Sequence, residues 1–60
     1  MKQYYKCVRK YEDGELTIHY WHGDSSKEGS VDHLHYCYDF VIPLGTHKPK
    51  NVSRETIKEF

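Results

Sequence analysis

Alternating apolar and polar side chains dominate the first third of the chain. The segment Lys2–Tyr11 (KQYYKCVRKY) is rich in aromatic and β-favouring residues, and Glu15–His22 (ELTIHYWH) alternates with period two. Asp13-Gly14 lies between these segments, and Asp-Gly is a strong signal for a tight hairpin turn because glycine adopts positive φ at low cost. The pattern predicts two antiparallel strands joined at Asp13-Gly14.

A two-residue turn would also set the register of this hairpin, with Tyr11 opposite Leu16 and Cys7 opposite Tyr20. The residues that share one face are then Tyr5, Cys7, Arg9, Tyr11, Leu16, Ile18, Tyr20 and His22. The residues on the other face are Tyr4, Lys6, Val8, Lys10, Thr17, His19 and Trp21.

The segment Val31–Ile42 (VDHLHYCYDFVI) also has period two, which predicts a third strand that ends at Pro43. Its apolar side would be a core face of Leu34, Tyr36, Tyr38, Phe40 and Ile42. Its other side would carry imidazole, thiol and carboxylate groups on His33, His35, Cys37 and Asp39. This two-sided strand is expected to be the central strand of the core.

The remaining segments predict connectors and one helix. Gly23–Ser30 is polar and glycine-containing, which is typical of a loop, and Leu44–Lys50 is a second connector. Ser53 is a good N-cap for a short C-terminal helix that would dock through Ile57 and Phe60. The expected fold class is α+β: a three-stranded antiparallel β-meander with a short C-terminal helix. A small all-β SH3-like or OB-like barrel is the alternative, with the third run bent near Asp39.

Length and charge limit the classes of function. Sixty residues predict a single small domain, residues 1–60, which buries a modest core and offers little scaffold for an enzyme cleft. Nine basic and nine acidic residues balance, which argues against nucleic-acid binding by bulk charge. No segment has the roughly 20 apolar residues of a membrane span, and no secretion signal is visible, so a cytoplasmic protein without a membrane partner is expected.

The leading functional hypothesis is a small regulatory protein without catalytic activity or cofactor. It would bind a partner protein through an exposed strand edge or aromatic face, because Tyr and Trp are typical interface anchors and strand edges invite pairing. The expected partner-binding residues are Tyr4, Lys6, Trp21, His33 and His35. In size and lack of catalytic motifs the chain is similar to small proteins of phages and mobile elements, which favours an inhibitor. A homodimer formed through a strand edge is a related alternative.

Two other hypotheses remain open. The first is a nucleic-acid-binding module that uses a basic, aromatic hairpin face of Lys2, Lys6, Arg9, Lys10, Tyr4 and Trp21. The second is a zinc-stabilised module with ligands drawn from His33, His35, Cys37 and Cys7. The zinc pattern is weak because ligands two residues apart on one strand lie about 7 Å from each other. The same row, with Asp39, has the residue types but not the orientation of a catalytic triad.

Overall fold

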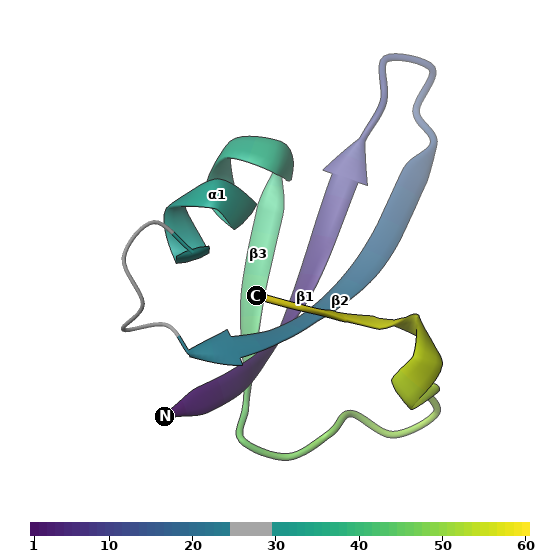
Figure 1. Cartoon of the computed structure of the whole chain (residues 1–60). Coiled ribbons are helices and arrows are strands. Elements are labelled where there is room, and N and C mark those ends of the chain that lie inside the picture. Colours follow the sequence, from purple (N-terminus) through teal and green to yellow (C-terminus); the bar gives the residue numbers. More distant parts are fainter. Residues whose placement is uncertain (25–29) are drawn as a thin grey trace.

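A four-stranded sheet with one short helix forms the protein (Figure 1). The computed structural model describes residues 1–24 and 30–60. The strands are β1 (Lys2–Lys10), β2 (Leu16–Asp24), β3 (Phe40–Gly45) and β4 (Ile57–Glu59). Helix α1 spans Ser30–Cys37, and the 3-10 turn η1 spans Arg54–Thr56. The fold is therefore sheet-dominated, as expected, but the predicted three-stranded meander with a C-terminal helix is not what forms.

The strand order is β3-β1-β2-β4, so the first hairpin forms the centre of the sheet. β1 pairs antiparallel with both β2 and β3, whereas β4 pairs parallel with β2. The alternative small all-β barrel is also not observed, because the described residues include helix α1 and a sheet whose edges are β3 and β4. The predicted loop at 23–30 falls mainly on residues 25–29, which lie outside the described residues.

The turn between β1 and β2 is one residue longer than predicted. Gly14 N–H donates to the Tyr11 carbonyl over 3.0 Å, Tyr11 N–H donates to the Glu15 carbonyl over 2.9 Å, and Gly14 has φ of 89°. This is a three-residue turn that ends in a glycine bulge, a common hairpin connection. As a result Cys7 lies opposite His19, not Tyr20, and the predicted register is wrong by one residue.

The segment predicted as the third strand is mostly helical. Ser30–Cys37 forms α1, and only Phe40–Ile42 of the predicted strand lies in β3. A helix-compatible spacing is present beneath the period-two pattern, because Val31, Leu34 and Tyr38 all pack on the core. Asp32 in the first turn also favours the helix through its interaction with the helix dipole.

Pro43 does not end the third strand, which continues to Gly45. Pro43 lies opposite Tyr5, and a bulge follows between Tyr4 and Tyr5. Proline is tolerated here because β3 is an edge strand, where a missing backbone donor costs little.

The predicted C-terminal helix is reduced to the single turn η1. Ser53 does act as its cap, since its side chain accepts from Glu55 N–H over 3.3 Å. Ile57 then turns into extended backbone and begins β4, which pairs with β2 at Tyr20. The cap was correctly predicted, but the residues after it gain more from sheet pairing than from a helix of two turns.

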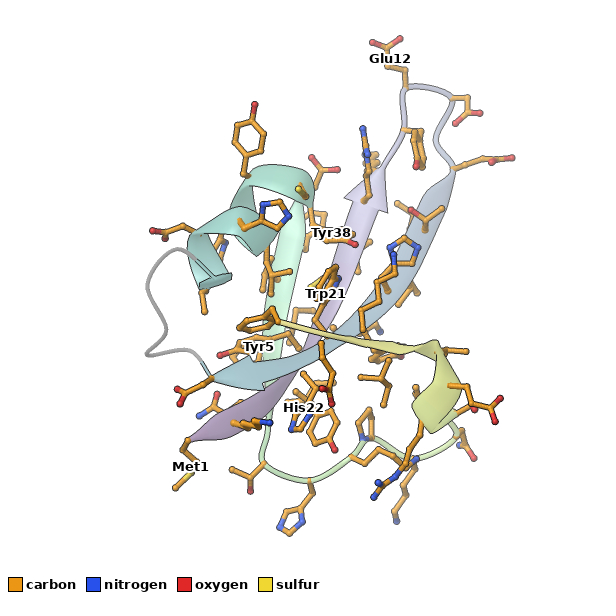
Figure 2. All side chains as sticks on the ribbon, in the orientation of Figure 1. Met1, Tyr5, Glu12, Trp21, His22 and Tyr38 are labelled. Atoms are coloured by element: carbon orange, nitrogen blue, oxygen red, sulfur yellow. The ribbon has the colours of Figure 1, made fainter. Side chains whose placement is uncertain are left out.

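The core is small and lies between the sheet and α1. Among the described residues, the buried apolar side chains are Tyr5, Cys7 and Leu34, and Leu34 is fully inaccessible. The partly buried side chains packed around them are Trp21, Val31, Tyr38, Val41 and Phe60. Figure 2 shows the labelled Trp21 and Tyr38 close together on this side of the sheet. Gly23 admits Phe60 to this cluster, because a Cβ at residue 23 would lie 2.6 Å from the Phe60 carbonyl oxygen.

Among the described residues, no helix has the length and apolar character needed to cross a membrane.

Replacing Leu34 should destabilise the whole fold. We expect Leu34→Ala to lower the free energy of unfolding by about 2–5 kcal/mol, because it removes the helix residue that fills the core. In a 60-residue domain this loss is enough to populate the unfolded state strongly. Urea unfolding followed by circular dichroism measures it, with Tyr36→Ala as the control because Tyr36 is 90% exposed on the same helix. Equal stability of the two variants would contradict the docking of α1 on the sheet.

Candidate functional site: the open face of the sheet

The hairpin register divides the sheet into a covered face and an open face. Tyr5 pairs with Trp21, and Cys7 pairs with His19 and Val41, so these side chains share the covered face beneath α1. Neighbouring residues along each strand point the other way. The open face, as used below, consists of Lys6, Val8, Leu16, Ile18, Tyr20, Phe40 and Ile42.

Apolar side chains on the open face remain in contact with solvent. Leu16 is 57% exposed, Ile18 48%, Phe40 56% and Ile42 45%. They come from β2 and β3, which flank β1, and the pairing places Val8 of β1 between Ile18 and Phe40. Single exposed apolar residues are ordinary, but a contiguous set on one sheet face is typical of an interaction surface.

A lysine lies in the middle of this apolar set. Lys6 is on the central strand β1, opposite Tyr20 on one side and Ile42 on the other. Lys2 and Lys10 lie on the same face of β1, four residues away in each direction. Within residues 1–24 and 30–60, the ammonium groups of these three lysines have no acidic partner.

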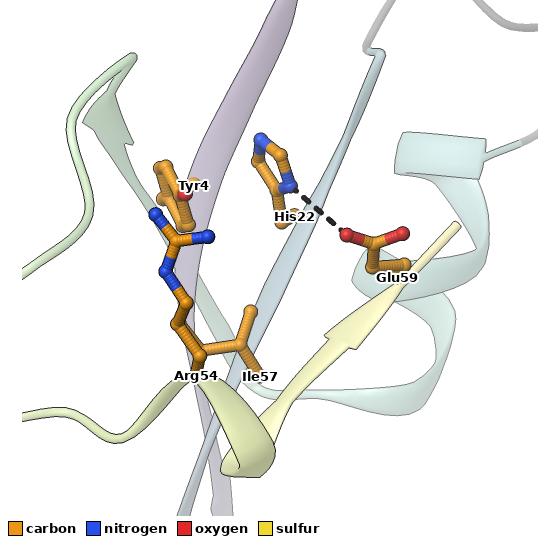
Figure 3. A pocket seen from close by; sticks show the side chains of 5 residues that line it. All are labelled: Tyr4, His22, Arg54, Ile57 and Glu59. Atoms are coloured by element: carbon orange, nitrogen blue, oxygen red, sulfur yellow. Dashed lines mark hydrogen bonds and ion pairs between the residues drawn. The ribbon is translucent and has the colours of Figure 1, made fainter.

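A small polar pocket adjoins the open face where β2 meets β4 (Figure 3). The side chains lining this cavity of about 110 Å³ are Tyr4, His22, Arg54, Ile57 and Glu59. The rings of Tyr4 and His22 are stacked with centroids 4.1 Å apart, and His22 Nδ1 lies 3.4 Å from Glu59 Oε1. The cavity is smaller than the roughly 150 Å³ that holds a benzene ring, so it accepts a group the size of a short side chain.

The five residues predicted to bind a partner do not form one surface. Tyr4 and Lys6 lie together on the open-face side of β1. Trp21 lies on the covered face, where its Nε1–H donates to the Tyr38 hydroxyl over 3.1 Å. His33 and His35 are exposed on α1. The structure therefore brings together the lysine and one tyrosine of the set and separates the other three.

The predicted basic, aromatic hairpin face is also divided by the register. Lys2, Lys6, Lys10 and Tyr4 share the open-face side, but Arg9 pairs with Thr17 and Trp21 pairs with Tyr5 on the covered side. Trp21 is contacted there by Phe60 and by the Lys58 ammonium, which lies 5.7 Å from the indole centroid. The expected grouping of Trp21 with the lysines is wrong.

The proposed zinc ligands are likewise separated. Cys7 is fully buried in the core, whereas His33, His35 and Cys37 belong to α1. Because they are four residues apart on the helix, His33 Nε2 and Cys37 Sγ lie 3.6 Å from each other. No group of three or more His, Cys, Asp or Glu suited to a metal ion occurs within the described residues. Both cysteines are free thiols.

The open-face residues Leu16, Ile18, Phe40 and Ile42 were not predicted as a site. The two-residue turn predicted from the sequence puts Leu16 and Ile18 on the same hairpin face as Cys7, and the predicted third strand has Phe40 and Ile42 on its core face. A signal was available in the excess of alternating apolar positions, since one eight-residue helix covers only one face of a four-stranded sheet. Comparison with protein-family models, curated proteins and solved structures found no match to this chain.

The Tyr38 hydroxyl joins the helix end to the covered face, and its removal should be measurable. It accepts from Trp21 Nε1–H and lies 2.8 Å from His19 Nδ1, to which it donates when the neutral imidazole carries its proton on Nε2. We expect Tyr38→Phe to cost about 1–2 kcal/mol in urea unfolding, because two partly buried groups lose a partner. Tyr36→Phe, at an exposed position, is the control and should be neutral. Equal effects would contradict this bridging role.

The two thiols should differ strongly in reactivity. Burial raises the pKa of the Cys7 thiol to about 11, from an unfolded value of 9.0, so the folded state holds it as the unreactive protonated form. Its contribution to stability is complete below pH 9.0 and is lost as the pH rises towards 11. Iodoacetamide labelling at about pH 8, below the range of free thiol pKa values, should modify partly exposed Cys37 well before Cys7. Labelling in urea, where both thiols are accessible, is the control. Equal rates of modification of Cys7 and Cys37 in the folded protein would contradict the burial of Cys7.

Proposed function

We propose that this chain is a non-catalytic cytoplasmic protein that regulates a partner protein by docking its open face on it. The observation that carries the proposal is the exposed apolar set Leu16, Ile18, Phe40 and Ile42 on β2 and β3, the two strands that flank β1. A sheet buries its apolar faces against other layers, and residues 1–24 and 30–60 supply one helix for one face. A second layer from another protein would complete the arrangement.

The accessible surface is consistent with such a missing layer. The chain exposes 4696 Å², whereas about 4100 Å² is expected for a folded monomer of 7.2 kDa. The difference is comparable to the roughly 800 Å² that each partner contributes to a standard protein interface. Covering the open face would therefore bring this chain to an ordinary balance of buried and exposed surface.

A partner of different sequence fits the open face better than a second copy. Lys6 lies at the centre of the face, between Tyr20 and Ile42. A two-fold axis through this centre would bring the Lys6 ammonium groups of two copies together, and like charges opposed in an interface are strongly unfavourable. A homodimer formed through a strand edge, considered from the sequence, would leave the open face uncovered and stays a separate prediction.

Selection from a random peptide library tests the proposal and requires no candidate partner. Peptides enriched on the immobilised wild-type protein should lose about tenfold or more in affinity to the double variant I18S/I42S, which truncates two exposed interface anchors. The control variant is H33S/Y36S on α1, which should bind them normally. Circular dichroism checks that all variants are folded.

Two outcomes would overturn the proposal. One is a set of selected peptides whose binding depends on α1 and is unchanged in I18S/I42S. The other is wild-type self-association in analytical ultracentrifugation that is abolished in I18S/I42S, since this would assign the open face to a second copy. A monomeric wild type with peptides that require Ile18 and Ile42 would support docking on a separate partner.

A further inference from the structure

The charges around the open face specify the chemistry of what it binds. Lys6 is at its centre, and Lys2 and Lys10 lie along the same side of β1. Arg54 lines the adjoining pocket and adds a fourth cation. The chain has no net charge, but these four cationic side chains lie on or beside its exposed apolar surface.

Three acidic residues near this surface already have partners: Asp24 and Glu59 have a cationic or imidazole partner, and the Asp39 carboxylate accepts from the Lys10 backbone N–H over 2.6 Å. Asp24 Oδ1 lies 3.3 Å from the N-terminal ammonium group, and Glu59 Oε1 lies 3.4 Å from His22 Nδ1. Asp24 and Glu59 lie at the ends of β2 and β4, whereas Lys6 is flanked by Tyr20 and Ile42. The centre of the open face is therefore positively charged as well as apolar.

We infer that the open face binds an acidic, amphipathic segment of the partner protein, an inference that rests on the docking function proposed above. Apolar side chains of the segment would pack on Leu16, Ile18, Phe40 and Ile42, and a carboxylate among them would pair with Lys6. Covering Lys6 with an apolar surface alone would desolvate its ammonium group without compensation. A carboxylate opposite Lys6 removes that cost and gives the interface its specificity.

Nucleic acid fits the same surface less well. The side chains opposite Lys6 and Lys10 are Tyr20, Ile42 and Leu16, so aliphatic groups interrupt the rings that base stacking would need. Arg9 and Trp21, which would complete a basic stacking surface, lie on the covered face. The chain also has no net positive charge to attract a polyanion over a distance.

The charge of the peptides selected on the open face tests this inference. We expect peptides enriched on wild type to contain apolar residues with more Asp and Glu than the starting library. Their Asp→Asn and Glu→Gln analogues should bind about tenfold or more weakly, and binding should weaken about fivefold between roughly 0.05 and 0.3 M salt.

Two charge reversals locate the effect. Lys6→Glu should abolish binding of the acidic peptides and remove the acidic bias from a new selection. Lys58→Glu makes the same change in charge on the covered face, beside Trp21. This variant should bind the acidic peptides as tightly as wild type and should select peptides with the same acidic bias. Thermal unfolding of each variant confirms that it is folded.

The results separate this inference from the proposed function. Peptides that require Ile18 and Ile42 but have no acidic bias would overturn the inference and leave docking on the open face intact. An absence of peptides that depend on the open face would overturn both. Tighter binding of a single-stranded oligothymidylate than of any peptide, lost in Lys6→Glu, would assign the surface to nucleic acid and also overturn the inference.

Discussion

The three-residue turn at Glu12–Gly14 determines which side chains become core and which face solvent. Gly14 adopts positive φ there and adds one residue to the connection, which places Cys7 opposite His19 and Tyr5 opposite Trp21. A shift of one residue would exchange the two faces of β2 relative to β1. The small core, the hydrogen bonds of Tyr38 and the exposed apolar surface all follow from this register. A glycine at the end of the turn is therefore the residue on which both the fold and the open face depend.

The sequence predicted the local elements of the hairpin and the Ser53 cap, but not how they combine. Asp-Gly is compatible with hairpin turns of two or three residues. The local sequence does not distinguish these two turn lengths, and only the packing of the side chains on the rest of the fold does. Val31–Ile42 satisfies both a strand period and, at Val31, Leu34 and Tyr38, a helix spacing. Short apolar runs do not separate these alternatives, and here α1 forms because Leu34 fills the space above Cys7 and Tyr5. The candidate site was missed for the same reason, since the two-residue turn grouped Leu16 and Ile18 with Cys7 and the strand pattern gave Phe40 and Ile42 to a core face.

In the part of the chain that the structure describes, one helix on a four-stranded sheet gives a two-layer arrangement with one open side. Among the described residues, its buried apolar side chains are an aromatic, a thiol and a leucine, with larger rings only partly covered around them. Such a core gives a marginal free energy of unfolding, because the buried apolar area barely offsets the conformational entropy lost on folding. Binding a partner to the open face would add to that stability by mass action, since the partner binds the folded chain alone. Docking and folding are thus expected to be coupled in this protein.

Lys6 makes non-specific apolar contacts with the open face unfavourable. An open sheet face of leucine, isoleucine and phenylalanine alone would associate with any apolar surface, including another copy of itself. A central ammonium group makes such contacts unfavourable, because each would bury a charge without a partner. The same group favours the surface that brings a carboxylate to it. Placing a cation on the middle strand, between Tyr20 and Ile42, therefore converts a non-specific apolar face into one that selects for an acidic partner.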